Sequence, residues 1–212
     1  MSLSTSAVVL PTYVYTIQDR GTQGCDGLSA IADDIQTTWN NGIDYPMTVD
    51  VDCTTIDIRE HNPADAYGAL HAVQDVVLSD FPGFAQSYDA VLVRDARDWN
   101  YPEGAATTGA PTAVDTTERF AAGSTGKKCV GYCSTSLSSH LEAHEVGHMY
   151  GGRHKRHERY GWWEHTVMGN SGAETCSGVN SDGRTRTNEW NGCVYSDITT
   201  YMDHWHSKRG VF

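Results

Sequence analysis

The stretch "HEVGHMYGGRH", residues 144–154, places three histidines, one glutamate and two adjacent glycines at fixed intervals. On an α-helix, residues four apart project from the same side about 6 Å apart, so His144 and His148 can offer imidazole nitrogens to one cation. A continued helix would carry His154 about 15 Å beyond His144, too far to bind the same ion. Gly151 can adopt a positive φ and end the helix, which would let His154 return as the third ligand. We therefore expect a three-histidine metal site at the end of a helix.

The glutamate of this stretch has a different expected role from the histidines. Glu145 is rotated about 100° around the helix from His144, so its carboxylate can lie beside an open metal position instead of on the ion. There it would accept a proton from water activated by the metal and deliver it to a leaving amine. Three protein ligands and one open position are typical of catalytic zinc, which makes Zn²⁺ the expected cofactor.

A surface helix with unrelated histidines is the alternative interpretation of the stretch. In shuffled chains of this composition the full pattern should arise in roughly 1 of 10,000 cases, which favours the metal site. Two other histidines are rival ligands. His140, His144 and His148 share one helical face but span about 12 Å, which is too long for a single ion. His157 could replace His154 only if the turn after the helix were longer.

The spacing of these residues resembles the signature of the metzincin zinc endopeptidases, His-Glu-x-x-His-x-x-Gly-x-x-His followed by a methionine turn. Five residues match it without a gap: His144, Glu145, His148, Gly151 and His154. In "HTVMGN", Met168 lies at a suitable distance to be the methionine that, in the family, forms a hydrophobic base beneath the histidines. Lys155 stands where reprolysins usually have Asp, and Asn170 where astacins and serralysins have Tyr, so the subfamily stays open.

The resemblance implies an α/β fold, with a mixed, mostly parallel twisted sheet and helices. Residues 1–154 would form an N-terminal subdomain that holds the sheet and the active-site helix. Residues 155–212 would form a small irregular C-terminal subdomain with the methionine turn and one long helix, completing a single catalytic domain. Substrates of the family lie extended along an edge strand of the sheet, and here we expect that strand between Tyr101 and Phe120.

The periodicity of the remaining sequence indicates the same order of elements. Alternating or β-branched runs predict strands at 7–17, 47–58 and 88–95, and helical spacing predicts helices at 27–42, 62–80 and 196–210. In the second helix, one apolar stripe is predicted, formed by Ala66, Leu70, Val73 and Val77. Strands that alternate with helices imply right-handed crossovers and a largely parallel sheet.

The composition excludes some classes of partner. The formal net charge is −12 at pH 7, and lysines and arginines do not cluster as a phosphate-binding surface requires, so no nucleic-acid partner is expected. No apolar run approaches the roughly 18 residues that span a bilayer. We expect a monomer that binds an extended polypeptide. Dense carboxylates are also typical of proteins from high-salt habitats, and an ordinary acidic secreted protein is the alternative.

The cysteines and the N-terminus bear on where the chain works. Six cysteines in a small acidic chain indicate three disulfides and an oxidising compartment. Proximity in sequence favours Cys176 with Cys193, with Cys25–Cys53 and Cys129–Cys133 as further candidates, while a thiolate zinc site is the alternative use. The N-terminus lacks the features of a signal peptide, so we expect a mature secreted domain from which the signal was removed.

These observations predict a secreted zinc-dependent endopeptidase, with Glu145 as the general base and Gly151 and Met168 as structural support. The alternative is a zinc-stabilised binding or adhesion module without catalysis, although a structural zinc site would need a fourth protein ligand that is not evident. A zinc hydrolase of non-peptide substrates would use the same residues. The segment "NSDGRTRTNEW", residues 180–190, makes Ca²⁺ a further candidate, but it lacks the ligand spacing of a calcium loop.

Overall fold

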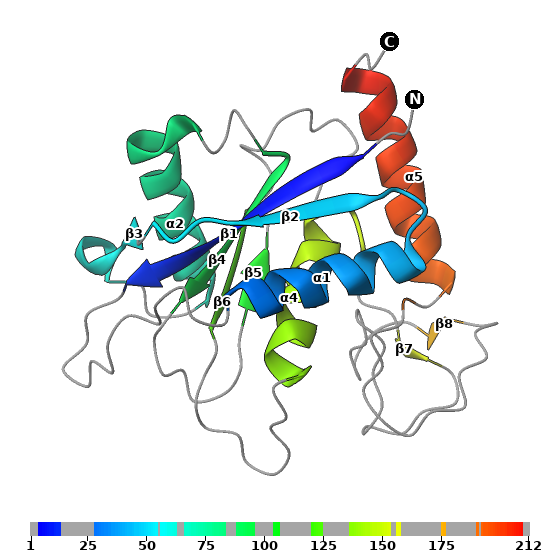
Figure 1. The fold of residues 1–212 in the computed structure, drawn as a ribbon, viewed down its shortest axis with the longest axis horizontal. Helices are drawn as coiled ribbons and strands as arrows, with labels where there is room; N and C mark the ends of the chain where they lie inside the picture. Colours follow the sequence, from blue (N-terminus) through cyan, green and yellow to red (C-terminus); the bar gives the residue numbers. More distant parts are fainter. Residues whose placement is uncertain are drawn as a thin grey trace.

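The structure is a computed structural model, and it describes a mixed α/β fold built on a small, mostly parallel sheet (Figure 1). The described residues are 4–13, 28–54, 56–62, 66–83, 88–95, 104–106, 120–124, 136–153, 156–157, 175–176, 190 and 192–209. None of the helices in these ranges combines the length and apolar character needed to cross a bilayer. The expected α/β fold with a mostly parallel sheet is confirmed.

The sheet has the strand order β2-β1-β4-β6-β5. Its parallel strands are β2 (Met47–Val51), β1 (Thr5–Tyr13), β4 (Ala90–Asp95) and β6 (Phe120–Ser124). The short β3 (Ile56–Asp57) continues the line of β2 and pairs in parallel with the far end of β1. At the other side of the sheet, β5 (Gly104–Ala106) pairs antiparallel with β6. The strand β5 lies at an end of the strand order and within residues 101–120, where the substrate-binding edge strand is expected, and its binding of a substrate stays a prediction.

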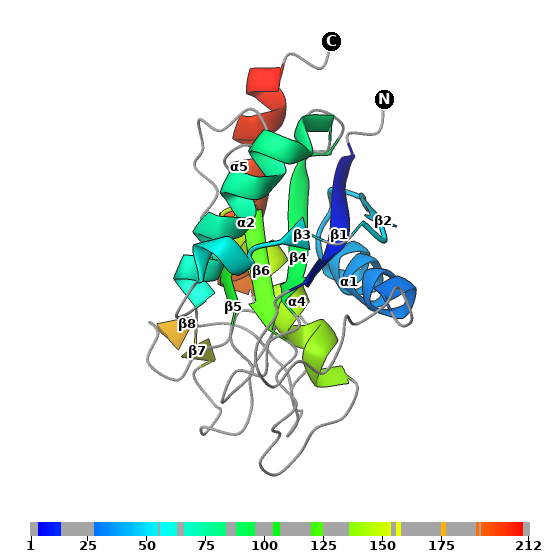
Figure 2. The same cartoon turned by 90° about the vertical axis from the view of Figure 1, so that its left-hand side faces the viewer.

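Helices cover both faces of the sheet, and β4 separates two hydrophobic cores (Figure 2). Ala90 and Leu92 face a core shared by α1 (Leu28–Gly42), α4 (Ser136–Met149) and α5 (Gly192–Arg209). Val91 and Val93 face the opposite core, which contains α2 (Ala66–Asp80). This alternation follows from the period of two along a strand. The predicted stripe of α2 is confirmed at Leu70, Val73 and Val77, which are all buried there, while the side chain of Ala66 is not described.

The outer edge of β2 is covered by side chains of α1. Asn40 accepts a hydrogen bond from the Met47 N–H at 2.7 Å and donates one to the Met47 carbonyl at 3.1 Å. Gln36 Oε1 accepts a hydrogen bond from the Val49 N–H at 2.9 Å. The two side chains reach alternate strand residues because four residues of a helix rise about 6 Å, which is close to the about 6.6 Å that two residues of a strand span. The main-chain groups of Met47 and Val49 that could pair with a further strand are therefore already hydrogen-bonded to α1.

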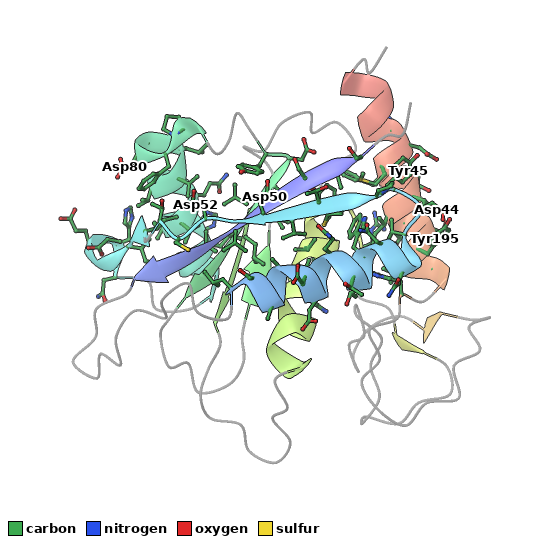
Figure 3. The ribbon with its side chains drawn as sticks, in the orientation of Figure 1. Asp44, Tyr45, Asp50, Asp52, Asp80 and Tyr195 are labelled. Atoms are coloured by element: carbon green, nitrogen blue, oxygen red, sulfur yellow. The ribbon has the colours of Figure 1, made fainter. Side chains whose placement is uncertain are left out.

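The turn between α1 and β2 is fastened to α5 by side-chain hydrogen bonds. Tyr195 donates to Asp44 Oδ2 at 2.5 Å, and Tyr45 donates to Asp203 Oδ1. Figure 3 shows Asp44 and Tyr45 beside Tyr195 of α5. The indole N–H of Trp190 donates to the Thr38 carbonyl at 2.9 Å. These contacts hold α5 against α1, although the two helices are far apart in the sequence.

The final helix, a second small sheet and the cysteines differ from the expectations or extend them. The final helix begins at Gly192 and not at residue 196, because Val194 extends its buried stripe by one turn. The strands β7 (Arg156–His157) and β8 (Thr175–Cys176) form a separate parallel pair. Cys53 and Cys193 each form a disulfide, whereas the expected pairings, like the division into two subdomains, stay predictions.

Candidate metal centre

The helix α4 carries the first part of the predicted site, and most of its second half is buried. Ala143, Val146 and Met149 pack into the core shared with α1 and α5. His144 and His148 are only partly buried, so they lie on the more open side of the helix. Their ring centroids are 4.9 Å apart, with the ring planes at 85°. Two imidazoles bonded to one tetrahedral ion through Nε2 would have centroids roughly 5 Å apart, so the two rings fit a shared metal.

The helix ends in a Schellman motif, as the sequence of glycines suggested. Gly151 has a φ of 85°, in the left-handed region that favours glycine. The Gly152 N–H donates to the Gly147 carbonyl at 2.9 Å, and the Gly151 N–H donates to the His148 carbonyl at 3.1 Å. These are the two hydrogen bonds that define the motif. The predicted end of the helix at Gly151 is confirmed.

Neither glycine of the motif leaves room for a side chain. A Cβ at Gly151 would lie 2.8 Å from the Cβ of Tyr201 on α5. A Cβ at Gly152 would lie 2.8 Å from the carbonyl oxygen of Gly147. The chain therefore reverses at the only type of residue that satisfies both the backbone conformation and the close approach of α5.

Gly152 also orients one of the proposed ligands, a role that we did not predict. His148 Nδ1 lies 2.8 Å from the Gly152 carbonyl oxygen. A carbonyl only accepts hydrogen bonds, so Nδ1 must carry the proton and Nε2 keeps its lone pair. Metal-binding histidines are commonly oriented in this way by a backbone carbonyl. The second of two consecutive glycines at a helix end is the sequence signal that could have pointed to this contact.

Glu145 is the most deeply buried ionisable group of the helix that the structure describes. Its side chain is 4% exposed. Burial raises the pKa of Glu145 from its usual value of 4.5 to about 8, because removal from water disfavours the charged form. A cation bound nearby would act in the opposite direction and favour the carboxylate.

Two of the predicted site residues, His154 and Met168, lie outside the described residues. Within the described ranges, no three His, Cys, Asp or Glu side chains form a group that could hold a metal. The rival ligand His157 lies in β7, and its side chain is not described. The calcium segment 180–190 falls outside the described residues except for Trp190, whose indole bonds to α1.

Comparisons with known proteins bear on the fold. The sequence matches no protein-family model and no curated protein. Among solved structures, the fold is similar to that of an archaemetzincin from Methanopyrus kandleri, with a TM-score of 0.53, 14% identity, and coverage of 94% of this chain and 96% of that one. It is similar to metalloproteinase-II from Bacteroides fragilis, with a TM-score of 0.52, 16% identity, and coverage of 94% and 54%.

A chain in a structure of a chaperone–substrate complex has a TM-score of 0.52 at 14% identity, with coverage of 95% of this chain and 35% of that one. The protein thus spans about a third of that chain, about half of the Bacteroides enzyme and almost all of the archaemetzincin. At such low identities, the likeness concerns the fold. The protein has a mixed α/β fold similar to the folds of the archaemetzincin and of the Bacteroides metalloproteinase.

Proposed function

We propose that the protein is a zinc-dependent endopeptidase in which His144, His148 and His154 bind the metal and Glu145 is the general base. One observation carries the proposal. Two imidazoles one helical turn apart lie at the spacing of ligands to a shared ion. The hydrogen bond from Nδ1 of His148 to the Gly152 carbonyl keeps the proton on Nδ1, so the lone pair that would bind a metal is on Nε2. The reversal of the chain at Gly151 supports a return of His154 to the same ion.

The donor set fits zinc better than other common cations. Imidazole nitrogens suit zinc, whereas calcium and magnesium prefer oxygen ligands. When bound, zinc would supply Lewis acidity that polarises the scissile carbonyl. The proposal adds no fourth protein ligand, because a catalytic site needs one open position for water and substrate.

The chain's own residues would carry out the proton transfers. Glu145 would take a proton from the attacking water and pass it to the leaving amine, so that its carboxylate is restored at the end of the cycle. Its burial supports this role, because a carboxylate shielded from bulk water interacts more strongly with groups beside it. Catalysis also requires a substrate held in register with these groups.

We assign the substrate, an extended polypeptide, to the outer edge of β5. This strand is the last in the sheet order and runs antiparallel to β6. An added segment could therefore bond to its main chain as a further strand. The covered edge of β2 makes the opposite side of the sheet unsuitable for the same contact.

Secretion and a monomeric state belong to the same proposal. The disulfides at Cys53 and Cys193 support an oxidising compartment. The acidic net charge of −12 supports a soluble working form that does not self-associate.

Metal content and proteolysis, measured together, test the proposal. The purified protein should contain about one zinc per chain, cleave casein, lose cleavage with a chelator and recover it when zinc returns. Zinc binding without cleavage of any peptide library would favour the adhesion module or a hydrolase of other substrates. Absence of zinc binding at pH 7 would reject the assignment of the three ligands.

A further inference from the structure

We infer that Tyr150 is a positioning residue for the metal site, held by a buried hydrogen-bond chain that links Asp89 and Thr5 of the sheet to the end of α4. The inference rests on the proposed function, because it concerns the orientation of the proposed ligand His148 and the position of the turn that precedes His154. Tyr150 itself touches neither the metal nor the substrate in this scheme.

The hydrogen-bond chain begins where two strands of the sheet start. Asp89 precedes β4, and its Oδ2 accepts a hydrogen bond from the Ser6 N–H at 2.8 Å. The Asp89 N–H in turn donates to the Ser6 carbonyl at 3.0 Å. Thr5 Oγ1 lies 3.1 Å from Asp89 Oδ2 and 2.8 Å from the Tyr150 hydroxyl. Asp89 is thus fixed by β1 and connects, through one hydroxyl, to the end of the helix.

The chemistry of the three side chains determines which of them donates and which accepts each hydrogen bond. A carboxylate only accepts hydrogen bonds, and a hydroxyl has one proton to donate. Thr5 therefore donates to Asp89 and accepts from Tyr150. Thr5 and Asp89 are 2% and 6% exposed and Tyr150 is 0% exposed, so water does not readily replace any of the three partners. Removal of one partner would leave the other polar groups buried without a hydrogen bond, which destabilises the folded protein. The arrangement of the three side chains is therefore strongly favoured over alternatives.

The aromatic ring of Tyr150 is fixed as firmly as its hydroxyl. It packs edge to face against Trp39 of α1, with centroids 5.1 Å apart, and against Tyr201 of α5, with centroids 6.4 Å apart. The ring fills the space between two helices while the hydroxyl reaches the sheet. Contacts with β1, α1 and α5 therefore fix the position of the last turn of α4.

From Tyr150, backbone contacts lead to the proposed ligand. The N–H groups of Tyr150 and Gly152 both donate to the Gly147 carbonyl, at 3.2 and 2.9 Å. The Gly152 carbonyl then accepts the hydrogen bond from His148 Nδ1. A displacement of Tyr150 would thus move the carbonyl that orients His148, and with it the segment that leads to His154.

The packing of the Tyr150 ring is not sufficient to hold the end of α4 in this position. A phenylalanine would keep the packing against Trp39 and Tyr201, but it would remove the hydrogen bond that Thr5 accepts. The last turn of α4 would then lose its direct bond to the sheet. Loss of a group that orients a metal ligand typically lowers metal affinity about 10–100-fold.

The test compares Tyr150→Phe with Tyr195→Phe. The control removes another hydrogen-bonded tyrosine hydroxyl, which donates to the Asp44 carboxylate in an exposed position on α5. Zinc affinity is measured by competition with a chromophoric chelator, and His148 in the metal-free protein is followed by ¹⁵N NMR. We expect zinc affinity to fall about 10-fold in Tyr150→Phe and to stay unchanged in Tyr195→Phe.

The NMR signals provide a readout that does not depend on bound metal. In Tyr150→Phe, the His148 imidazole should shift from a single Nδ1–H tautomer toward a mixture. An unchanged zinc affinity and tautomer in a folded Tyr150→Phe protein would overturn the inference, even if its stability fell.

A second pair of variants keeps the inference testable if Tyr150→Phe does not fold. Thr5→Val removes the linking hydroxyl, whereas Thr5→Ser retains it. The serine variant should keep the zinc affinity of the original protein, and the valine variant should lose about as much as Tyr150→Phe. Equal affinities in the two variants would contradict the inference. Failure of the unmodified protein to bind zinc would instead reject the proposed function, so the two outcomes are distinguishable.

Discussion

Gly151 and Tyr201 approach so closely that a Cβ at Gly151 would lie 2.8 Å from the Cβ of the tyrosine. The turn that follows α4 thus packs directly against α5. The position of the turn therefore depends on α5 as well as on α4. Two helices that are distant in the sequence thus meet beside the proposed metal site.

Gly151→Ala should therefore destabilise the protein and weaken zinc binding. The new Cβ meets Tyr201, and the φ of 85° is strained for any residue with a side chain. We expect a loss of about 1–3 kcal/mol in urea unfolding. Gly83→Ala is the matched control, because no atom lies within 4 Å of its added Cβ, and it should change stability by less than about 0.5 kcal/mol. Equal effects of the two substitutions would contradict this account.

Glu145→Gln should keep the metal and lose catalysis. The amide has nearly the same shape as the carboxylate, but it cannot accept and return a proton. We expect zinc content to stay the same and kcat to fall by at least about 100-fold. Glu60→Gln, an exposed substitution in the short 3₁₀ helix Arg59–His61, is the control and should leave kcat unchanged. Turnover retained in Glu145→Gln would reject the role of this residue as general base.

The pH dependence of stability in the metal-free protein offers a separate check on Glu145. Its pKa of about 8 in the folded chain exceeds the usual 4.5, so between these values the folded state holds a proton that the unfolded state lacks. Stability should fall as pH rises through this window, by about 1.4 kcal/mol per pH unit from this group. Urea unfolding of the chelated protein, compared with chelated Glu145→Gln, isolates the effect. Identical pH profiles for the two proteins would show that the carboxyl group is not buried.

Removal of the side chains that cover the β2 edge should cause self-association. In the double variant Gln36→Ala and Asn40→Ala, the Met47 and Val49 N–H groups become available to a strand of another molecule. Light scattering over a range of concentrations should show dimers or larger species, with a stability loss of about 1 kcal/mol per lost bond. Asn41→Ala, an exposed neighbour on the same helix, should remain monomeric. A monomeric double variant at high concentration would refute the covering role.

Much of the fold follows from local sequence patterns. The stripe of Leu70, Val73 and Val77 is buried because helical periodicity alone places these residues on one face. Gly151 ends α4 because few other residues tolerate its backbone conformation. The sequence places the start of α5 too late, because Ser196 is a plausible capping residue, whereas the buried stripe continues back to Val194 and the helix begins at Gly192.

The contacts that aim the proposed site were not predictable in the same way. Thr5, Asp89 and Tyr150 are distant in the sequence, and each residue type is ordinary at its position. Only the sheet register, with Ala7 opposite Ala90, brings the first two together. The bond between His148 and Gly152 is local, but it depends on the three-dimensional path of the Schellman turn.

The division of the interior by β4 has a practical consequence for engineering. The buried residues of α4 beside the proposed metal ligands belong to the side of Ala90 and Leu92, while α2 packs on the side of Val91 and Val93. Libraries that randomise the solvent-facing positions of α2, such as His71 and Asp75, would leave the side chains around α4 untouched. That helix is accordingly a suitable place for immobilisation chemistry or a grafted recognition sequence.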